Sequence, residues 1–201
     1  MRRRLRLGMI GGGRGAFIGA VHRIAARLDD RYELVAGVLS SDPQRARESG
    51  AELLLDPQRC YVTVDEMVKA EAARQDKMDV VAIVTPNHLH HVAAKKCLEA
   101  RFHVICDKPL ATSTADAQDL LDTAERVERV LAVTYNYSGY PMVRQAREMV
   151  ANGELGELRV VHVEYAQEWL TTLLEAEGQK QAAWRADPKQ VGAAAAVGDI
   201  G

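Results

Sequence analysis

The amino-acid sequence predicts an α/β fold built on a doubly wound parallel sheet. Three observations point to this class. Apolar, strand-like runs alternate with helical patterns over residues 5–134, the run Val80–Val84 is continuously apolar, as in a parallel strand covered on both faces, and a glycine cluster at residues 11–13 separates the first strand from the first helix. Right-handed crossovers would place helices on both faces of such a sheet.

Each element of this first part is expected from its local pattern. Strands are expected at residues 5–10, 32–39, 60–64, 80–84, 102–106 and 130–134. Helices are expected at residues 16–28, from 43 onward, and at 65–74, 91–100 and 114–129. Asp42 followed by Pro43 is a typical helix start, and Ser113 or Thr114 provides a cap for the last of these helices.

The pattern changes after Tyr135. A helix is expected at residues 141–152, and residues 157–165 then alternate between apolar and polar, which is typical of an antiparallel strand with one face on a core. We therefore expect two domains. The first is complete over residues 1–134, and residues 135–201 begin an α/β domain with a mainly antiparallel sheet.

The composition limits the classes of function. Of the 201 residues, 47% are hydrophobic and 27% are charged, as in globular rather than disordered proteins. The 26 basic and 28 acidic side chains give a net charge of −2, without the basic excess of proteins that bind nucleic acid or membrane surfaces. The three cysteines lack the paired spacing of a zinc site, so no metal is expected. Neither a signal peptide nor a membrane-spanning run is found, which favours a cytoplasmic protein.

The glycine-rich turn carries the first indication of chemistry. The residues assigned to cofactor binding here are Gly11, Gly13, Arg14, Gly15 and Ala16. Their spacing matches G-x-G-x-x-A, in which glycines let a pyrophosphate approach the backbone at a helix N-terminus, and Gly19 is the expected helix-packing glycine. A methyltransferase or a purely structural turn could carry a similar cluster, but the strand–turn–helix context favours nucleotide binding.

The end of the second strand bears on the choice of cofactor. An acid that binds the ribose hydroxyls usually stands here, whereas this chain has Ser40-Ser41 and then Asp42, which is better suited to capping the next helix. Without that carboxylate a 2′-phosphate meets no repulsion, and Arg45 could reach one. Ser40, Ser41 and Arg45 are therefore predicted to bind the cofactor, and NAD and NADP both stay open.

Two later strand ends carry polar motifs. Thr85-Pro86-Asn87, with His90 after it, follows the fourth expected strand, and Asp107-Lys108-Pro109 follows the fifth. Both come at the carboxyl edge, where α/β sheets bind ligands. Proline and asparagine are common in turns, whereas a lysine at the mouth of a buried strand is the sharper indication of function.

Together these motifs resemble the glucose–fructose oxidoreductase/inositol dehydrogenase/MocA (Gfo/Idh/MocA) family of NAD(P)-dependent dehydrogenases. The matches follow the family order along the whole chain: Gly11-x-Gly13, Gly19-x-x-His22, Thr85-Pro86-Asn87-x-x-His90, Asp107-Lys108-Pro109-Leu110, Asn136-Tyr137, Pro141, Arg144, Gly153-x-x-Gly156, Trp184-Arg185 and Gly198-Asp199-Ile200-Gly201. The usual Glu-Lys-Pro of the family stands here as Asp-Lys-Pro. The resemblance implies a Rossmann-type domain followed by a substrate domain.

The resemblance also implies roles for single residues. Lys108 matches a catalytic lysine beside the nicotinamide and the substrate hydroxyl, where it would stabilise a developing alkoxide, and Asp199 matches an aspartate of the substrate pocket. The Thr85-Pro86-Asn87 segment and His90 match the cofactor cleft, and Trp184-Arg185 matches a segment that folds back over the cofactor. The family's catalytic histidine would come two residues beyond Gly201, so the resemblance implies a truncated chain with little activity of its own.

The function implied is that of an oxidoreductase. It would transfer a hydride between NAD or NADP and a hydroxyl or keto carbon of a sugar, an inositol-like cyclitol or a related polyol, as a homo-oligomer and with neither nucleic acid nor membrane as partner. Two alternatives stay open. A noncatalytic dinucleotide-binding module, or an inactive fragment, would make no use of Lys108. A methyltransferase would want an acid after the second strand and no Lys-Pro after the fifth.

Overall fold

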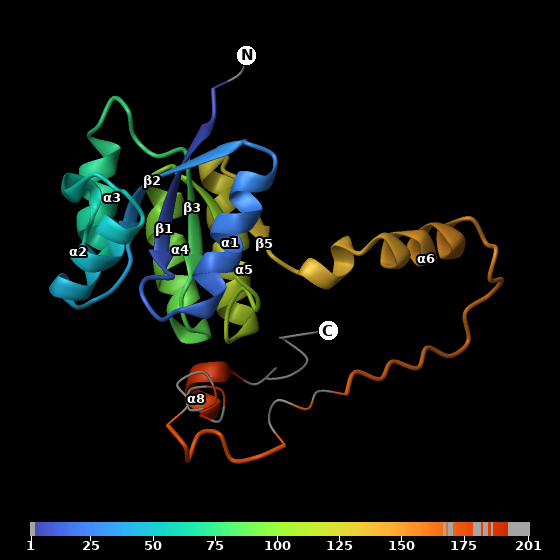
Figure 1. Cartoon of the computed structure of the whole chain (residues 1–201). Coiled ribbons are helices and arrows are strands. Elements are labelled where there is room, and N and C mark those ends of the chain that lie inside the picture. The colour runs from blue at the N-terminus through green and yellow to red at the C-terminus, as the bar shows by residue number, and fades with distance from the viewer. Residues whose placement is uncertain are drawn as a thin grey trace. The chain divides into compact units, whose positions relative to one another are not determined.

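The computed structural model describes residues 3–166, 168, 171–178, 182, 185 and 187–192 (Figure 1). The chain forms two compact units, Met1–Thr134 and Tyr135–Gly201, and each is described by itself. Two residues predicted for the site, Trp184 and Asp199, lie outside the described residues.

A five-stranded parallel sheet forms the centre of the first unit (Figure 1). Its strands are β1 (Leu5–Gly11), β2 (Tyr32–Val38), β3 (Val80–Val84), β4 (His103–Cys106) and β5 (Leu131–Val133), in the spatial order β2-β1-β3-β4-β5. Because β2 lies on one side of β1 and all later strands lie on the other, the winding reverses between β1 and β3. The predicted doubly wound α/β fold is confirmed, and its topological switch point falls where β1 and β3 end.

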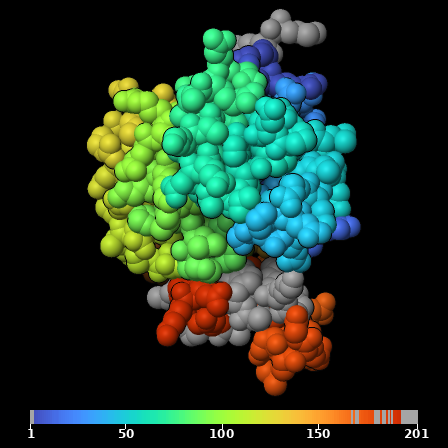
Figure 2. All heavy atoms as spheres, turned by 90° about the vertical axis from the view of Figure 1, so that its left-hand side faces the viewer, coloured from blue at the N-terminus to red at the C-terminus, as the bar shows by residue number. Residues whose placement is uncertain are grey.

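Helices cover both faces of this sheet. Residues of α1 (Phe17–Leu28) pack on one face with Val80, Ala82 and Val84 of β3. The alternate residues Val81 and Ile83 point to the other face, where they join a core with α3 (Val64–Ala72), α4 (His90–Glu99) and α5 (Thr114–Val127). Figure 2 views the molecule from the side of α2 (Pro43–Glu52) and α3, which together form a closely packed surface there.

The expected strand at residues 60–64 is not formed, so that prediction was wrong. Only one bridge, between Gly37 and Cys60, extends the sheet here, and a helical turn, η1 (Pro57–Arg59), precedes it. Side chains hold this segment instead. Arg59 Nε and Nη2 donate to the two carboxylate oxygens of Glu71 on α3 at 2.9 and 2.5 Å, and both side chains are buried. This ion pair joins η1 to α3 without a strand ladder.

The helix α1 leaves an apolar stripe in solvent. Phe17, Val21, Ile24 and Leu28 recur with helical period and are 72%, 42%, 56% and 78% exposed. The fully buried residue of this helix is Gly19. Helix α1 therefore approaches the glycine turn closely at Gly19, and its partly buried Ile18 and Ala26 pack against the core on the sheet.

The second unit contains η3 (Asn136–Gly139), α6 (Pro141–Ala151) and the short α8 (Pro188–Val191). The antiparallel strand expected at residues 157–165 is not formed. The backbone there belongs to no strand, and Val160, Val161 and Val163 are 85%, 74% and 82% exposed. A strand needs a neighbour to pair its backbone groups, and the described residues of this unit supply none.

None of the described helices has the length and hydropathy that a bilayer crossing requires. The described residues also bring no group of three or more His, Cys, Asp or Glu side chains together in a way that could hold a metal ion.

Candidate functional site

The turn between β1 and α1 has a backbone shape that glycine adopts most readily. Gly11, Gly12 and Gly15 have φ angles of 85°, 72° and 79°. Gly12 also lies against α1. A Cβ added to Gly19 of that helix would overlap the Cα of Gly12. Gly19 is thus the helix-packing glycine that the sequence predicts, and here the turn and the helix meet backbone to backbone.

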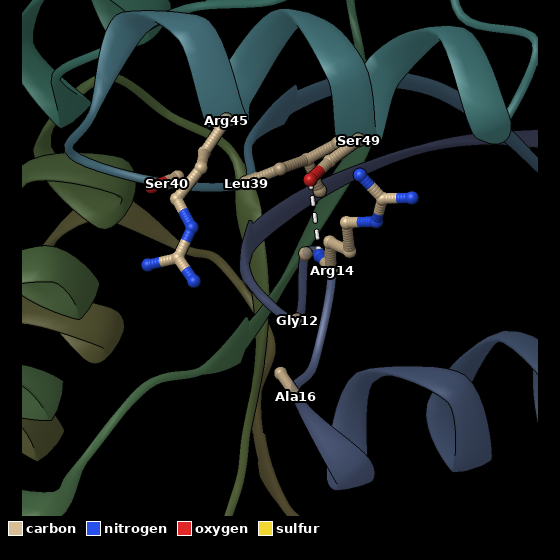
Figure 3. Close-up of a pocket in the computed structure, with 8 residues that line it drawn as sticks. Gly12, Arg14, Ala16, Leu39, Ser40, Arg45 and Ser49 are labelled. Carbon is tan, nitrogen blue, oxygen red and sulfur yellow. Dashed lines mark hydrogen bonds between the residues drawn. The ribbon is translucent and has the colours of Figure 1, made fainter.

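Gly13 is enclosed by the end of β2 and by α2. A Cβ here would overlap the Leu39 carbonyl oxygen and lie 2.9 Å from Ser49 Oγ. The buried Ser49 hydroxyl accepts a hydrogen bond from the Arg14 amide at 3.0 Å (Figure 3). Beside these contacts is a cavity of about 90 Å³, lined by Gly12, Gly13, Arg14, Ala16, Leu39, Ser40, Arg45 and Ser49. Pockets for whole ligands hold roughly 300–1,000 Å³, so this cavity would receive one part of a cofactor.

The N-terminus of α1 follows this turn and lacks a side-chain cap. Ala16 has the extended N-cap conformation (φ −95°, ψ 124°), but it offers no acceptor, and no acidic residue lies in the first turn of the helix. By contrast, Asp42 caps α2 and Ser113 caps α5, as predicted. The first amides of a helix carry a partial positive charge, so this end of α1 suits an anion supplied from outside the chain.

The segment after β2 is held by its own side chains. Ser40 Oγ accepts from the Asp42 amide at 3.1 Å, and Asp42 Oδ1 accepts from the Arg45 amide at 2.7 Å. The Arg45 side chain extends from α2 past Ser40 (Figure 3), and both residues line the cavity. Ser41, predicted beside them, is exposed and does not line it.

The segment after β3 places Thr85 beside the glycine turn. Gly11 pairs with Val84 in the sheet, and a Cβ on Gly11 would lie 3.1 Å from Thr85 Cγ2. Thr85 Oγ1 is buried and has no hydrogen-bond partner among the residues that the structure describes. Asn87, two residues on, is also buried, at 6% exposed. A buried hydroxyl without a partner costs free energy, so Thr85 is suited to receive a ligand's polar group.

His90 begins α4 and is fully buried. Its Nδ1 lies 2.7 Å from the Pro109 carbonyl oxygen, and its Nε2 lies 2.8 Å from the Thr85 carbonyl oxygen. Both ring nitrogens therefore face backbone atoms of the chain itself. This arrangement favours an indirect role in the site over the direct cofactor contact that the resemblance implies.

The segment after β4 carries Lys108. Asp107 Oδ1 accepts hydrogen bonds from the Lys108 amide at 2.9 Å and from the Thr134 hydroxyl at 3.1 Å. Lys108 is half-buried, and the peptide bond between Lys108 and Pro109 is cis. Because β3 and β4 are parallel neighbours, this segment and the one that begins at Thr85 leave the sheet at the same edge.

Two residues of α1 face the site from the helix. Arg23 Nη1 donates to the Gly12 carbonyl at 2.7 Å, which ties the helix to the turn a second time. Burial lowers the pKa of His22, and the charge of Asp107 opposes that shift. Burial therefore favours a neutral ring for His22 near the segment that carries Lys108.

The structure brings most of the predicted residues to one edge of the first unit. They are Gly11, Gly13, Arg14, Gly15, Ala16, Ser40, Ser41, Arg45, Thr85, Pro86, Asn87 and Lys108. Arg185 is half-buried with helical backbone in the second unit.

Sequence reasoning missed Ser49 and Arg23. Each makes a hydrogen bond to the turn, and neither stands in a motif. A weak indication of Ser49 does exist, because Ala46, Ser49 and Gly50 place small residues on one face of α2, all of them buried. Such a face lets another segment approach the helix closely. Nothing local distinguishes Arg23 from the other arginines of α1.

The residues present fit a dinucleotide. The glycine turn admits a phosphate close to the backbone, the uncapped start of α1 offers amides to it, and the unpartnered Thr85 hydroxyl lies at the next strand end. These features define a nucleotide-binding edge of a doubly wound sheet.

The family comparison agrees with this class. The model "Oxidoreductase family, NAD-binding Rossmann fold" matches residues 5–135, and "GFO/IDH/MocA C-terminal domain" matches residues 143–201. The chain belongs to the Gfo/Idh/MocA family of oxidoreductases, and its first part is an NAD-binding Rossmann domain.

Several relatives are similar over most of this chain. The "Uncharacterized oxidoreductase YfiI" of Bacillus subtilis is 40% identical over 98% of this chain and 50% of its own length. An oxidoreductase from Sinorhizobium meliloti is 58% identical over 85% of this chain and 47% of its own, with a TM-score of 0.81. An inositol dehydrogenase homolog from Azotobacter vinelandii, complexed with NAD+, is 42% identical over 100% of this chain and 51% of its own, with a TM-score of 0.93. The chain thus spans about half the length of these relatives.

Proposed function

We propose that the protein acts as an NAD(P)-dependent oxidoreductase on a sugar, a cyclitol or a related polyol. The observation that carries this proposal is the single sheet edge shared by the glycine turn, the uncapped start of α1 and the Lys108 segment. A structure of an inositol dehydrogenase homolog from Azotobacter vinelandii with NADH and myo-inositol, 42% identical, supports the substrate class. In this proposal residues 1–134 bind the cofactor, and residues 135–201 begin the domain for substrate binding and oligomerisation.

The residues that would hold the cofactor follow from the geometry. The backbone of the turn at Gly11, Gly13 and Gly15 and the first amides of α1 would bind the pyrophosphate. Ser40 and Arg45 line the cavity in which the adenosine ribose would lie. Thr85 and Asn87 would contact the nicotinamide half of the cofactor, where the hydride is transferred.

The chain's own contribution to the chemistry centres on Lys108. A bound nicotinamide supplies the hydride acceptor or donor. The Lys108 ammonium would donate a hydrogen bond to the substrate oxygen and stabilise its negative charge as the hydroxyl proton leaves. That proton must pass to a base whose pKa lies near neutrality. Asp199, as a proposed residue of the substrate pocket, would help to position that base.

Cofactor titration tests this proposal. We expect saturable quenching or enhancement of NADH fluorescence and no binding of S-adenosylmethionine. Lys108→Met should leave the NADH dissociation constant within about three-fold, because the amine acts on the substrate, and should abolish any turnover on a panel of inositols and sugars. Binding of S-adenosylmethionine in place of NADH would refute the proposal. NADH binding with turnover indifferent to Lys108 would instead indicate a noncatalytic dinucleotide-binding module.

The choice between NAD and NADP depends on Arg45 in this proposal. Arg14 contacts Glu48 and Glu52 at 3.4 and 3.1 Å, whereas Arg45 makes no ion pair among the described residues and lines the cavity. Ser40 stands where a ribose-binding acid is expected after β2, and the Asp42 carboxylate accepts from the Arg45 amide instead. Comparing NADPH with NADH affinity in Arg45→Ala, with the exposed Arg47→Ala as control, tests whether Arg45 holds the 2′-phosphate. A loss of NADPH affinity without a loss of NADH affinity in Arg45→Ala would show that Arg45 holds that phosphate.

Assembly and location are proposed on the same basis. We expect a homo-oligomer in the cytoplasm, since the resemblance implies an interface on the substrate-domain sheet. Light scattering measures the oligomeric state of the protein, and cell fractionation measures its location.

A further inference from the structure

The ring of His90 lies between two backbone carbonyl oxygens. Nδ1 is 2.7 Å from the Pro109 oxygen, Nε2 is 2.8 Å from the Thr85 oxygen, and the residue is 0% exposed. Both lengths are those of good N–H···O hydrogen bonds. Because a carbonyl oxygen only accepts, the ring donates from whichever nitrogen carries the proton.

The ring can serve both contacts in either tautomer. An imidazole N–H donates to one carbonyl oxygen, and the other ring nitrogen packs against the second. The ring therefore fills the space between the two carbonyl groups whichever nitrogen carries the proton.

The two carbonyl groups belong to the two segments that form the site. Thr85 follows β3 and lies against Gly11 of the turn. Pro109 follows Lys108 directly, after β4. The sheet brings these segments to one edge, but its ladder ends at Cys106, so beyond that point other contacts must hold them together.

We propose that His90 is a positioning residue. Through its two ring nitrogens it contacts both the Thr85 and the Pro109 carbonyls, ties them together and fixes the Lys108 backbone relative to the glycine turn. The role of this tie in the reaction rests on the proposed function, because the tie would act by holding Lys108 in place. The tie itself is a property of the chain alone.

The first test reads the ring directly in the unmodified chain. In a nitrogen-15 NMR spectrum recorded without cofactor, we expect a His90 ring N–H that is protected from exchange with water by its hydrogen bond to a carbonyl oxygen. A ring N–H that exchanges as fast as that of an exposed histidine would overturn the proposal. Because no cofactor is present, this result does not depend on whether the protein is a dehydrogenase.

The second test compares two neighbouring histidines. His90→Gln removes the ring that contacts both carbonyls, whereas His91→Gln changes a residue whose Nε2 contacts Asp119 of α5 at 2.6 Å. We expect His90→Gln to shift the backbone amide resonances of residues 85–87 and 107–110 and to weaken NADH binding at least five-fold. His91→Gln should leave those resonances in place and change the NADH affinity less than two-fold.

The outcomes separate the tie from the function. A folded His90→Gln protein with unmoved resonances would refute the tie. If that variant does not fold, the ring spectrum of the unmodified chain decides. If the unmodified chain binds no NADH, the proposed function fails, while the ring spectrum and the resonances still decide on the tie.

Discussion

At the scale of single residues, the carboxylate of Glu71 has the most partners away from the site. It accepts hydrogen bonds from Arg59, from the Tyr61 hydroxyl at 3.0 Å and from the Met78 amide at 3.0 Å, and it is 0% exposed. Burial and then the Glu71 charge raise the pKa of Tyr61 to about 12. The charge of Glu71 is therefore fully compensated, but only while every partner is present.

Replacing Glu71 by glutamine should destabilise the protein strongly. The variant leaves the buried Arg59 guanidinium without its counter-charge, and breaking such a pair costs about 3–5 kcal/mol. Urea unfolding followed by circular dichroism measures the loss, and the pKa of Tyr61 should fall as the negative charge disappears. Asp76→Asn is the matched control, because Asp76 contacts the same arginine at 3.5 Å but its side chain is 52% exposed. Equal losses in both variants would contradict this account.

Sequence reasoning found residues whose type and strand-end position carry chemistry, such as Lys108 and Asp42. It could not find Ser49 or Arg23, because each acts on the glycine turn through the tertiary fold. The same holds for His90, whose place in a motif was visible but whose two partners, at residues 85 and 109, depend on neighbouring strands. Contacts between distant segments need the fold before they can be assigned.

At the scale of elements, α1 begins without a side-chain cap, as α4 and α6 do, whereas α2, α3 and α5 are capped. An alanine at the N-cap gives up about 1 kcal/mol relative to aspartate or serine. A helix that forgoes its cap beside a glycine turn gains from an anion at that end. Stability and binding should therefore respond in opposite directions to a change at Ala16.

Ala16→Asp provides that test. Aspartate should cap α1 and raise the thermal midpoint, since it adds both an acceptor and a favourable charge at the positive end of the helix. The same carboxylate should repel a pyrophosphate and weaken NADH binding at least ten-fold. Differential scanning calorimetry and fluorescence titration measure the two effects. Ala16→Ser, a neutral cap, should stabilise the helix with a smaller loss of affinity, and a gain in NADH affinity with aspartate would contradict anion binding here.

The starts of β1 and β3 are joined by Asp79. Its carboxylate accepts from Arg3 at 2.6 and 2.8 Å and from the Arg6 amide at 2.7 Å. The Arg3 hydrogen bonds, together with the Arg6 amide and both charges, lower the pKa of Asp79 despite partial burial. The stability from this ion pair is thus fully present above the unfolded value of about 3.9 and is lost as pH falls through the folded value.

Asp79→Asn should flatten the acid limb of the stability curve. Without the titrating carboxylate, the free energy of unfolding should depend less on pH between roughly pH 5 and pH 2 than in the unmodified protein. Chemical unfolding at a series of pH values measures this slope. Parallel curves for the two proteins would show that Asp79 has no role in acid unfolding.

Local sequence patterns predicted the helices and strands better than they predicted what each element packs against. Apart from the strand expected at residues 60–64, the strands and helices of the first unit fall near their expected ranges, because apolar runs and cap residues are local features. The strand expected at residues 157–165 was wrong, since alternation alone provides no partner for its backbone. The helix expected at residues 16–28 is also formed, but its Phe17 and Leu28 face solvent, and its Gly19 packs against Gly12 of the turn.

At the scale of the whole molecule, the apolar core belongs to the first unit. Both core clusters draw all their residues from Leu7 to Leu131. A core of that extent is enough for an independent domain of common size. The first unit should therefore fold without the second.

A chain ending at Thr134 should unfold in one cooperative transition and bind NADH. Its thermal midpoint should lie within a few degrees of that of the first unit in the 201-residue chain, and its NADH affinity within about three-fold. Calorimetry and fluorescence titration check both. A molten or aggregating product would show that residues beyond Thr134 stabilise the sheet.

The central strand sets how backbone motion should be distributed around the site. All five residues of β3 are buried, and both of its neighbours pair with it. Its amides should exchange with solvent deuterium only when the whole domain opens, and amides of the turns that follow should exchange through small local openings. Protection should therefore drop sharply from Val84 to Asn87, and a bound dinucleotide should extend the slow-exchanging region across that boundary.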